Sequence, residues 1–209
     1  MNEGTCRLTP GAILLGVSGE PLILASASPR RRALLHMLGL RYECVVPQVS
    51  EDGPHLSESP AERVEHLARL KAAWVPRERL AYAVLAADTV VWLDGEIFGK
   101  PADEAEARRF LMRLSDRWHD VYTGVCLRRL SDERTVVGHE RSRVRFGSLS
   151  EQDIRDYIAT GEPMDKAGAY GIQGYGGLLV ERIEGCYFNV MGLPLSRLRR
   201  LAHELEGRS

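Results

Sequence analysis

Residues 83–93, AVLAADTVVWL, decide the fold of this chain, because they form its most apolar candidate for a buried strand. Asp94-Gly95 follows directly, and residues 96–98 then read Glu-Ile-Phe. An Asp-Gly pair between two apolar runs favours a tight turn that joins antiparallel strands. The sequence therefore predicts a hairpin near the middle of the chain, with residues 83–93 as its longer strand.

On either side of this hairpin, segments with strand patterns alternate with segments of helical periodicity. Further strands are predicted at residues 22–26, 42–46, 121–130, 135–146 and 178–183. Helices are predicted from Ser28 to Leu38, after Ser59, at residues 103–114 and 150–160, and along the leucine stripe of residues 195–205. Interleaved strands and helices with a central hairpin predict an α/β fold with a mixed sheet.

Length and composition limit the possible functions. The chain has 209 residues, 44% of them hydrophobic, and a formal net charge of −1, which suits one globular domain. Near-neutral charge argues against a nucleic-acid or membrane-surface partner, and no apolar run reaches the about 18 residues that span a bilayer. The four cysteines are far apart, which favours reduced thiols and a cytoplasmic location. We expect residues 1–20 to be a partly disordered extension, followed by a single domain over 21–207.

Asp88 is the clearest residue that folding alone does not explain. It interrupts the apolar run of residues 85–91, and a buried carboxylate costs several kcal/mol, roughly, unless it is paired, hydrated or bound to a metal. A catalytic or metal-binding carboxylate is one interpretation, and an Asp at a strand end facing a turn is the other.

Lys71 is a cation on an apolar helix face. Val64, Leu67, Ala68 and Lys71 follow the i, i+3, i+4, i+7 spacing of one helical stripe. The spacing leaves two alternatives open: the lysine extends to the edge of the stripe, or it meets an anion.

Ser26-Ala27-Ser28-Pro29-Arg30-Arg31 places two arginines in the first turn of a helix. Cations there oppose the helix dipole, whereas a bound phosphate would use the free N–H groups and the guanidinium groups together. A solvated arginine pair is the alternative. Lys100, in Gly99-Lys100-Pro101, is a weaker candidate of the same kind.

Residues 165–177, DKAGAYGIQGYGG, are rich in glycine, which would let the backbone approach a ligand closely or simply form a flexible loop. They lack the dinucleotide-binding glycine spacing, and no phosphate-binding P-loop motif occurs in the chain. Cations for a polyphosphate, together with a carboxylate for a hard cation such as Mg²⁺, favour metal-assisted attack of water on a phosphoryl centre.

These segments, together with Val190-Met191-Gly192-Leu193-Pro194, resemble the Maf family of nucleotide pyrophosphatases over residues 22–205. The resemblance implies an elongated mixed sheet flanked by helices, with a deep cleft between two lobes, similar to inosine triphosphate pyrophosphatases. It implies that the triphosphate is bound by Ser26, Arg30, Arg31, Lys71 and Lys100. It also implies that Glu51 and Asp88 serve the divalent cation (Mg, Mn or Co) and the attacking water.

The family divides by substrate, and Arg31, Thr89 and Gln173 match its dTTP/UTP branch rather than the 7-methyl-GTP branch. We therefore expect hydrolysis of dTTP and UTP to monophosphate and pyrophosphate. A homodimer is a separate expectation, which does not follow from these residues. The alternative is a nucleotide-binding regulator of cell division that performs no turnover.

Overall fold

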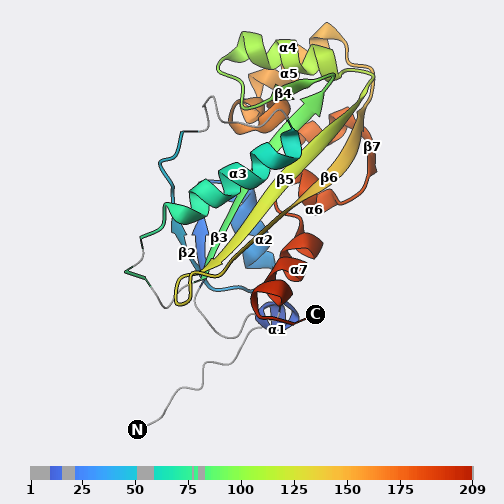
Figure 1. Cartoon of the computed structure of the whole chain (residues 1–209). Coiled ribbons are helices and arrows are strands. Elements are labelled where there is room, and N and C mark those ends of the chain that lie inside the picture. Colours follow the sequence, from blue (N-terminus) through green and yellow to red (C-terminus); the bar gives the residue numbers. More distant parts are fainter. Residues whose placement is uncertain (1–9, 16–21, 51–58, 77, 80–82, 209) are drawn as a thin grey trace.

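The computed structural model describes residues 10–15, 22–50, 59–76, 78–79 and 83–208 (Figure 1). Its strands are β1 (Leu22–Ala25), β2 (Tyr42–Val45), β3 (Ala83–Leu93), β4 (Glu96–Phe98), β5 (Trp118–Arg129), β6 (Thr135–Phe146) and β7 (Val180–Glu184). Its α-helices are α1 (Pro10–Leu15), α2 (Pro29–Met37), α3 (Pro60–Ala73), α4 (Glu104–Leu114), α5 (Glu151–Ala159), α6 (Tyr187–Val190) and α7 (Leu195–Leu205).

The described strands form one seven-stranded sheet in the order β2-β1-β3-β5-β6-β7, with β4 paired to β3. β1 is parallel to both β2 and β3, whereas the β3–β5, β5–β6 and β6–β7 pairs are antiparallel. The predicted α/β fold with a mixed sheet is confirmed. In the β3–β5 register, Asp88 lies opposite Gly124 and Thr89 lies opposite Thr123.

The central hairpin forms where the sequence predicts it. β3 has the predicted bounds, and its partner β4 pairs in antiparallel register, with Leu93 opposite Glu96. Asp94 and Gly95 have φ angles of 51° and 84°, the left-handed backbone that a tight hairpin turn requires and that an Asp-Gly pair tolerates.

Helices cover both faces of the sheet (Figure 1). α3 packs on β3 and β5, and it lies so close that a side chain at Gly124 would approach the Val64 carbonyl oxygen to 2.2 Å. α2 and α7 share an apolar core on the opposite face, while α4 and α5 pack together at one end of the sheet. Because α3 packs so closely on the sheet, its buried face, which includes Lys71, lies over the middle of β3, which carries Asp88.

Some local predictions need correction. α3 begins after Ser59 as predicted, but the Ser59 side chain makes no capping hydrogen bond, so the Ser59-Pro60-Ala61-Glu62 sequence, which favours a capping box, does not form one. Residues 162–179, which include the glycine-rich segment, contain three short 3₁₀ helices (Glu162–Asp165, Ala167–Ala169 and Tyr175–Leu179) in place of the simple loop that was one alternative for this segment. α6 was not predicted, because a helix of four residues leaves no periodic pattern in the sequence.

Part of the predicted N-terminal extension is described. Residues 10–15 form α1, which contacts α7, and Leu15 belongs to the apolar core. The rest of 1–20 lies outside the described residues. Along the part of the chain that the structure describes, no helix combines the length and the apolar character needed to cross a membrane.

Candidate active site

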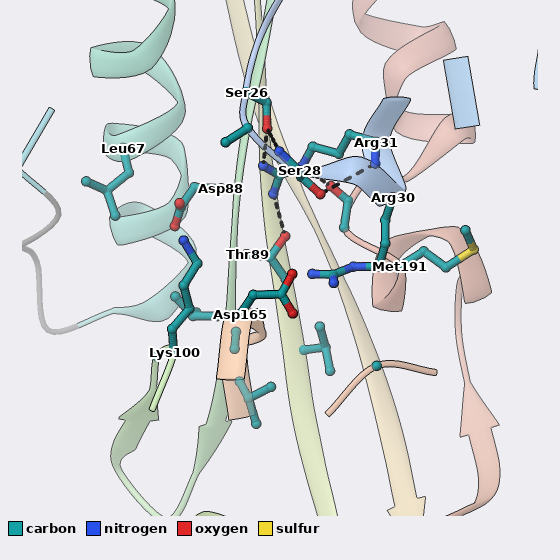
Figure 2. Close-up of a pocket in the computed structure, with 18 of the residues that line it drawn as sticks. Ser26, Ser28, Arg30, Arg31, Leu67, Asp88, Thr89, Lys100, Asp165 and Met191 are labelled. Atoms are coloured by element: carbon teal, nitrogen blue, oxygen red, sulfur yellow. Dashed lines mark hydrogen bonds between the residues drawn. The ribbon is translucent and has the colours of Figure 1, made fainter. Parts of the chain in front are cut away.

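A pocket of about 500 Å³ opens where several chain segments meet. Its walls come from the β1–α2 connection, α3, the middle of β3, the β4–α4 connection, the glycine-rich segment and the end of α6 (Figure 2). This volume falls within the range of about 300–1,000 Å³ that is usual for small-molecule sites. Most of the candidate residues from the sequence line it, namely Ser26, Arg30, Arg31, Lys71, Asp88, Thr89 and Lys100.

Asp88 and Lys71 form an ion pair inside this pocket. Lys71 Nζ donates to Asp88 Oδ1 at 2.5 Å, and the two residues are only 8% and 6% exposed. Of the two alternatives for Lys71, the structure therefore supports the one in which the lysine meets an anion, and that anion belongs to the protein. A buried ion pair is weak evidence for stability, because apolar residues of similar size are often as stable at such a place. The pair is therefore a candidate for a functional role.

The β1–α2 connection presents the N-terminus of α2 to the pocket. Ser28 caps the helix by accepting a hydrogen bond from the Arg31 N–H at 3.5 Å, and Ser26 Oγ accepts from the Ser28 N–H at 3.2 Å. Pro29 occupies the first turn, as predicted. The partial positive charge of a helix N-terminus therefore faces the pocket, which favours an anionic ligand.

The two arginines of this segment point to different places. The Arg30 guanidinium faces the carboxylate of Asp165 in the close-up (Figure 2). Burial lowers the pKa of Arg30, and the nearby charge of Asp165 partly opposes this shift. Even so, an arginine keeps its proton at neutral pH, so Arg30 is a partly desolvated cation at the pocket wall.

Arg31 instead binds protein groups from three other places in the fold. Its Nη1 donates to Ser26 Oγ (3.0 Å), its Nη2 to Thr89 Oγ1 (3.0 Å) and its Nε to the Gly192 carbonyl (2.7 Å). The residue is 8% exposed. In this arrangement Arg31 fixes β1, β3 and the α6–α7 connection relative to one another, in addition to the phosphate-binding role predicted for it.

Thr89 extends this network into the core. Thr123 Oγ1 donates to the Asn189 carbonyl at 3.0 Å, and it also lies 3.0 Å from Thr89 Oγ1. A hydroxyl has one proton to donate, so Thr89 must donate to Thr123 while accepting from Arg31. The directions of all three hydrogen bonds are therefore fixed, which orients the Arg31 guanidinium.

Lys100 is exposed and extends from the β4–α4 connection toward Asp88 (Figure 2). The backbone before it is held in place, because the Gly168 N–H donates to the Gly99 carbonyl at 3.0 Å. The short segment Gly99-Lys100-Pro101 is thus joined to the glycine-rich segment, and Gly99 and Lys100 form one wall of the pocket together with that segment.

Gln173 does not belong to the lining of this pocket and is exposed. Asp165, Tyr170 and Gly171 line it instead. Asp165 and Thr123 were not singled out from the sequence. The motif containing Asp165 pointed to its segment but not to its carboxylate, and a lone threonine in a strand carries no signal.

A buried pair lies behind the Tyr170 part of the wall. His119 Nε2 is 2.8 Å from Tyr170 Oη, and burial lowers the pKa of His119 to about 3. The imidazole is therefore neutral at physiological pH. It contacts the rings of both Tyr170 and Phe146 edge-on, which fixes the tyrosine that faces the pocket.

Carboxylate oxygens that could serve a metal ion are few in the described pocket. Asp88 and Asp165 line it, whereas Glu51 lies outside the described residues. Within the described ranges, no cluster of three or more His, Cys, Asp or Glu side chains could hold a metal by itself. Such a donor set fits Mg²⁺, which is usually held by one or two carboxylates, substrate phosphates and water.

An α/β sheet with a cation-lined pocket at a helix N-terminus defines a protein suited to a small polyanionic ligand. The chain belongs to the Maf-like protein family, whose model matches residues 21–205.

Curated relatives extend the similarity over most of the chain. A dTTP/UTP pyrophosphatase of Symbiobacterium thermophilum is 53% identical over 178 residues, covering 85% of this chain and 90% of the relative. A dTTP/UTP pyrophosphatase of Dictyoglomus thermophilum is 48% identical over 186 residues, covering 89% and 96%. A third, from Clostridioides difficile, is 49% identical over 180 residues, covering 85% and 91%.

Proposed function

We propose that this chain hydrolyses nucleoside triphosphates, preferably dTTP and UTP, to nucleoside monophosphate and pyrophosphate. The observation that carries the proposal is the buried Lys71–Asp88 pair, which places a carboxylate in a pocket that Arg30, Arg31 and Lys100 also line. The names of the relatives, dTTP/UTP pyrophosphatase, support the reaction and the choice of base.

In this proposal the cations of the pocket bind the triphosphate. Arg30 and Lys100 would contact its oxygens, since each is a charged hydrogen-bond donor, and the partial positive charge at the N-terminus of α2 would attract the same oxygens. Lys71 lies beside Asp88, so it would balance the charge of that carboxylate while adding positive charge near the phosphates.

Asp88 would accept a proton from the attacking water. The water oxygen then forms a bond to the α-phosphorus, the bond to the bridging oxygen of the β-phosphate breaks, and pyrophosphate leaves with that oxygen. Asp88 would also hold a divalent cation together with the substrate phosphates, and Glu51 remains a proposed second ligand. When bound, such a cation lowers the pKa of water and shields phosphate charge.

Base preference is proposed to depend on Arg31, Thr89 and Gln173. The Arg31–Thr89 hydrogen bond lies at the pocket and would present a fixed edge to the ligand. Gln173 would have to reach the base from outside the described lining. Its amide can both donate and accept, which suits the carbonyl and N–H of thymine or uracil.

The test is pyrophosphate release from dTTP, UTP, CTP, GTP and 7-methyl-GTP with Mg²⁺, Mn²⁺ or Co²⁺, and with a chelator. We expect dTTP and UTP to have the highest kcat/KM, with about ten- to a hundred-fold discrimination against purines. Gln173→Ala should reduce that discrimination. Release of orthophosphate would contradict the proposed bond cleavage, and binding without turnover would favour the regulator of cell division instead.

We also propose that the enzyme is cytoplasmic, since nucleoside triphosphates are cytoplasmic metabolites. A second, independent proposal is that it forms a homodimer. Light scattering coupled to size-exclusion chromatography would decide the oligomeric state. Residues 21–207 are proposed to act as one domain, which is supported by the family match over 21–205.

A further inference from the structure

The glycine-rich segment is held by a single carboxylate that does not line the pocket. Glu162 begins the first short 3₁₀ helix, and its two oxygens accept hydrogen bonds from three donors. Oε2 accepts from the Tyr175 N–H at 3.0 Å, and Oε1 accepts from the Gly176 N–H at 3.0 Å and from the Tyr157 hydroxyl at 2.9 Å. Hydrogen bonds to a carboxylate are stronger than those between neutral groups.

Tyr157 extends this contact to the pocket wall itself. Its hydroxyl donates to Glu162 and at the same time accepts a hydrogen bond from the Gly171 N–H at 3.2 Å. Gly171 lines the pocket. Glu162 therefore holds residues 175 and 176 directly and residue 171 through Tyr157, so both ends of the 171–176 loop are fixed.

Two glycines are explained by this packing. Gly174 has a φ of +98°, and a Cβ there would lie 2.4 Å from Glu162 Oε2. At Gly176, a Cβ would lie 2.5 Å from the Gly171 carbonyl oxygen and 2.6 Å from the Tyr157 hydroxyl. These glycines thus allow the loop to close on the protein's own carboxylate and backbone, a different use from the close approach to a ligand that the sequence suggested.

The charge state of Glu162 fits this role. Burial acts to raise the pKa of its carboxyl group, but the N–H groups of Gly176 and Tyr175, the Tyr157 hydroxyl and the charge of Lys166 lower it by more. The net shift is downward, so the carboxylate is ionised at neutral pH and accepts all of these hydrogen bonds.

The same short helix ends at Asp165, which faces Arg30 across the pocket (Figure 2). A shift of the Glu162 end would therefore move the acidic partner of Arg30 as well as Tyr170 and Gly171. We propose that Glu162 is a positioning residue for the proposed pyrophosphatase reaction, holding the 165–176 wall in the form that receives the nucleotide. This rests on the proposed function for its substrate, but the loop contact can be tested without turnover.

The experiment compares the wild type with Glu162→Gln, Tyr157→Phe and Glu151→Gln. Gln keeps the size of Glu162 but turns one acceptor oxygen into an N–H₂ group that faces a donor. Tyr157→Phe removes the hydroxyl that joins Glu162 to Gly171, and it leaves the hydrogen bonds from the Tyr175 and Gly176 N–H groups to Glu162 in place. Glu151 is the matched control, since it is an exposed glutamate on the neighbouring α5 whose ion pairs go to Arg108 and Arg155.

Two readouts are needed, namely amide hydrogen exchange of peptides covering residues 165–180 and steady-state kinetics with dTTP. We expect exchange in the loop of Glu162→Gln to become about tenfold faster, with a smaller effect in Tyr157→Phe. KM should rise about tenfold in Glu162→Gln, while kcat changes by about twofold or less. Glu151→Gln should match the wild type in both readouts.

Unchanged loop exchange in both Glu162→Gln and Tyr157→Phe would overturn the proposal. So would faster exchange with an unchanged KM, because the loop would then have no bearing on the pocket. If Glu162→Gln fails to fold, Tyr157→Phe decides by the same criteria. A wild type that binds dTTP without hydrolysing it would contradict the proposed function alone, since exchange and the dissociation constant for dTTP would still test the loop contact.

Discussion

Lys71 Nζ lies 2.5 Å from Asp88 Oδ1, and this pair joins the buried face of α3 to the middle of the central strand β3. Both residues lie in the pocket, and both interrupt apolar patterns in the sequence. Each residue compensates the charge of the other in a place where a lone charge would be costly. The proposed catalysis and the stability of the fold therefore involve the same contact, and separate substitutions can distinguish the two.

Replacing Asp88 by Asn should abolish turnover while the chain still folds. Asn keeps the shape but loses the charge that accepts a proton and holds a cation. We expect kcat to fall by about a hundredfold or more, the scale for loss of a general base. Pyrophosphate release under saturating dTTP measures kcat. Retention of more than about a tenth of the wild-type activity would contradict the proposal that Asp88 accepts the proton and holds the cation.

Removing Lys71 alone should cost stability. Lys71→Met leaves the Asp88 carboxylate without this partner, and breaking a buried pair costs about 3–5 kcal/mol at most sites, less where water enters the pocket. The double variant Lys71→Met/Asp88→Leu should recover most of that loss, because apolar residues replace both charges. Urea unfolding of the wild type, both single variants and the double variant gives the coupling energy. Additive losses would show that the two side chains do not interact.

Arg31→Lys should lower both stability and activity. A lysine cannot reach Ser26, Thr89 and the Gly192 carbonyl together, because it lacks the planar, forked guanidinium group. We expect a loss of about 1–3 kcal/mol in unfolding free energy and weaker discrimination among bases. Arg32→Lys is the matched control, since Arg32 is the exposed neighbour on the same helix. If Arg31→Lys and Arg32→Lys had equal unfolding free energies and equal discrimination among bases, the Arg31 hydrogen bonds would be dispensable.

His119 should make stability fall in mild acid. Burial lowers its folded pKa to about 3, whereas an unfolded histidine titrates near about 6.5. Below about pH 6.5 the unfolded chain therefore binds more protons at this site, so its contribution is present above that pH and is lost progressively as pH falls toward 3. The loss is about 2 kcal/mol at about pH 5.

His119→Gln keeps a hydrogen-bonding group near Tyr170 but does not titrate. Thermal unfolding of wild type and variant between pH 8 and pH 5 isolates the histidine, because all other titrating groups are shared. We expect the variant to lose about 2 kcal/mol less unfolding free energy than the wild type when the pH falls to about 5. Parallel curves would contradict the buried neutral imidazole.

The sequence by itself determined the elements that local rules control. The apolar run of residues 83–93 was the strongest candidate for a buried strand, and Asp94-Gly95 tolerates the positive φ angles of the turn that follows. Pro29 after Ser28 fixed the start of α2. Asp88 was recognisable because it interrupts a continuous apolar run, and Lys71 because it breaks the periodic apolar stripe of a helix. Both interruptions are visible without coordinates.

Only the tertiary structure decided which of these groups meet. Residues 71 and 88 come together because α3 lies directly on β3 and β5, which depends on Gly124 and on packing between segments far apart in the chain. The Arg31–Thr89–Thr123 hydrogen bonds and the Glu162 contacts arise in the same way. Hydrogen bonds act over about 3 Å, so their partners are set by how the elements pack, and local sequence patterns do not encode that distance.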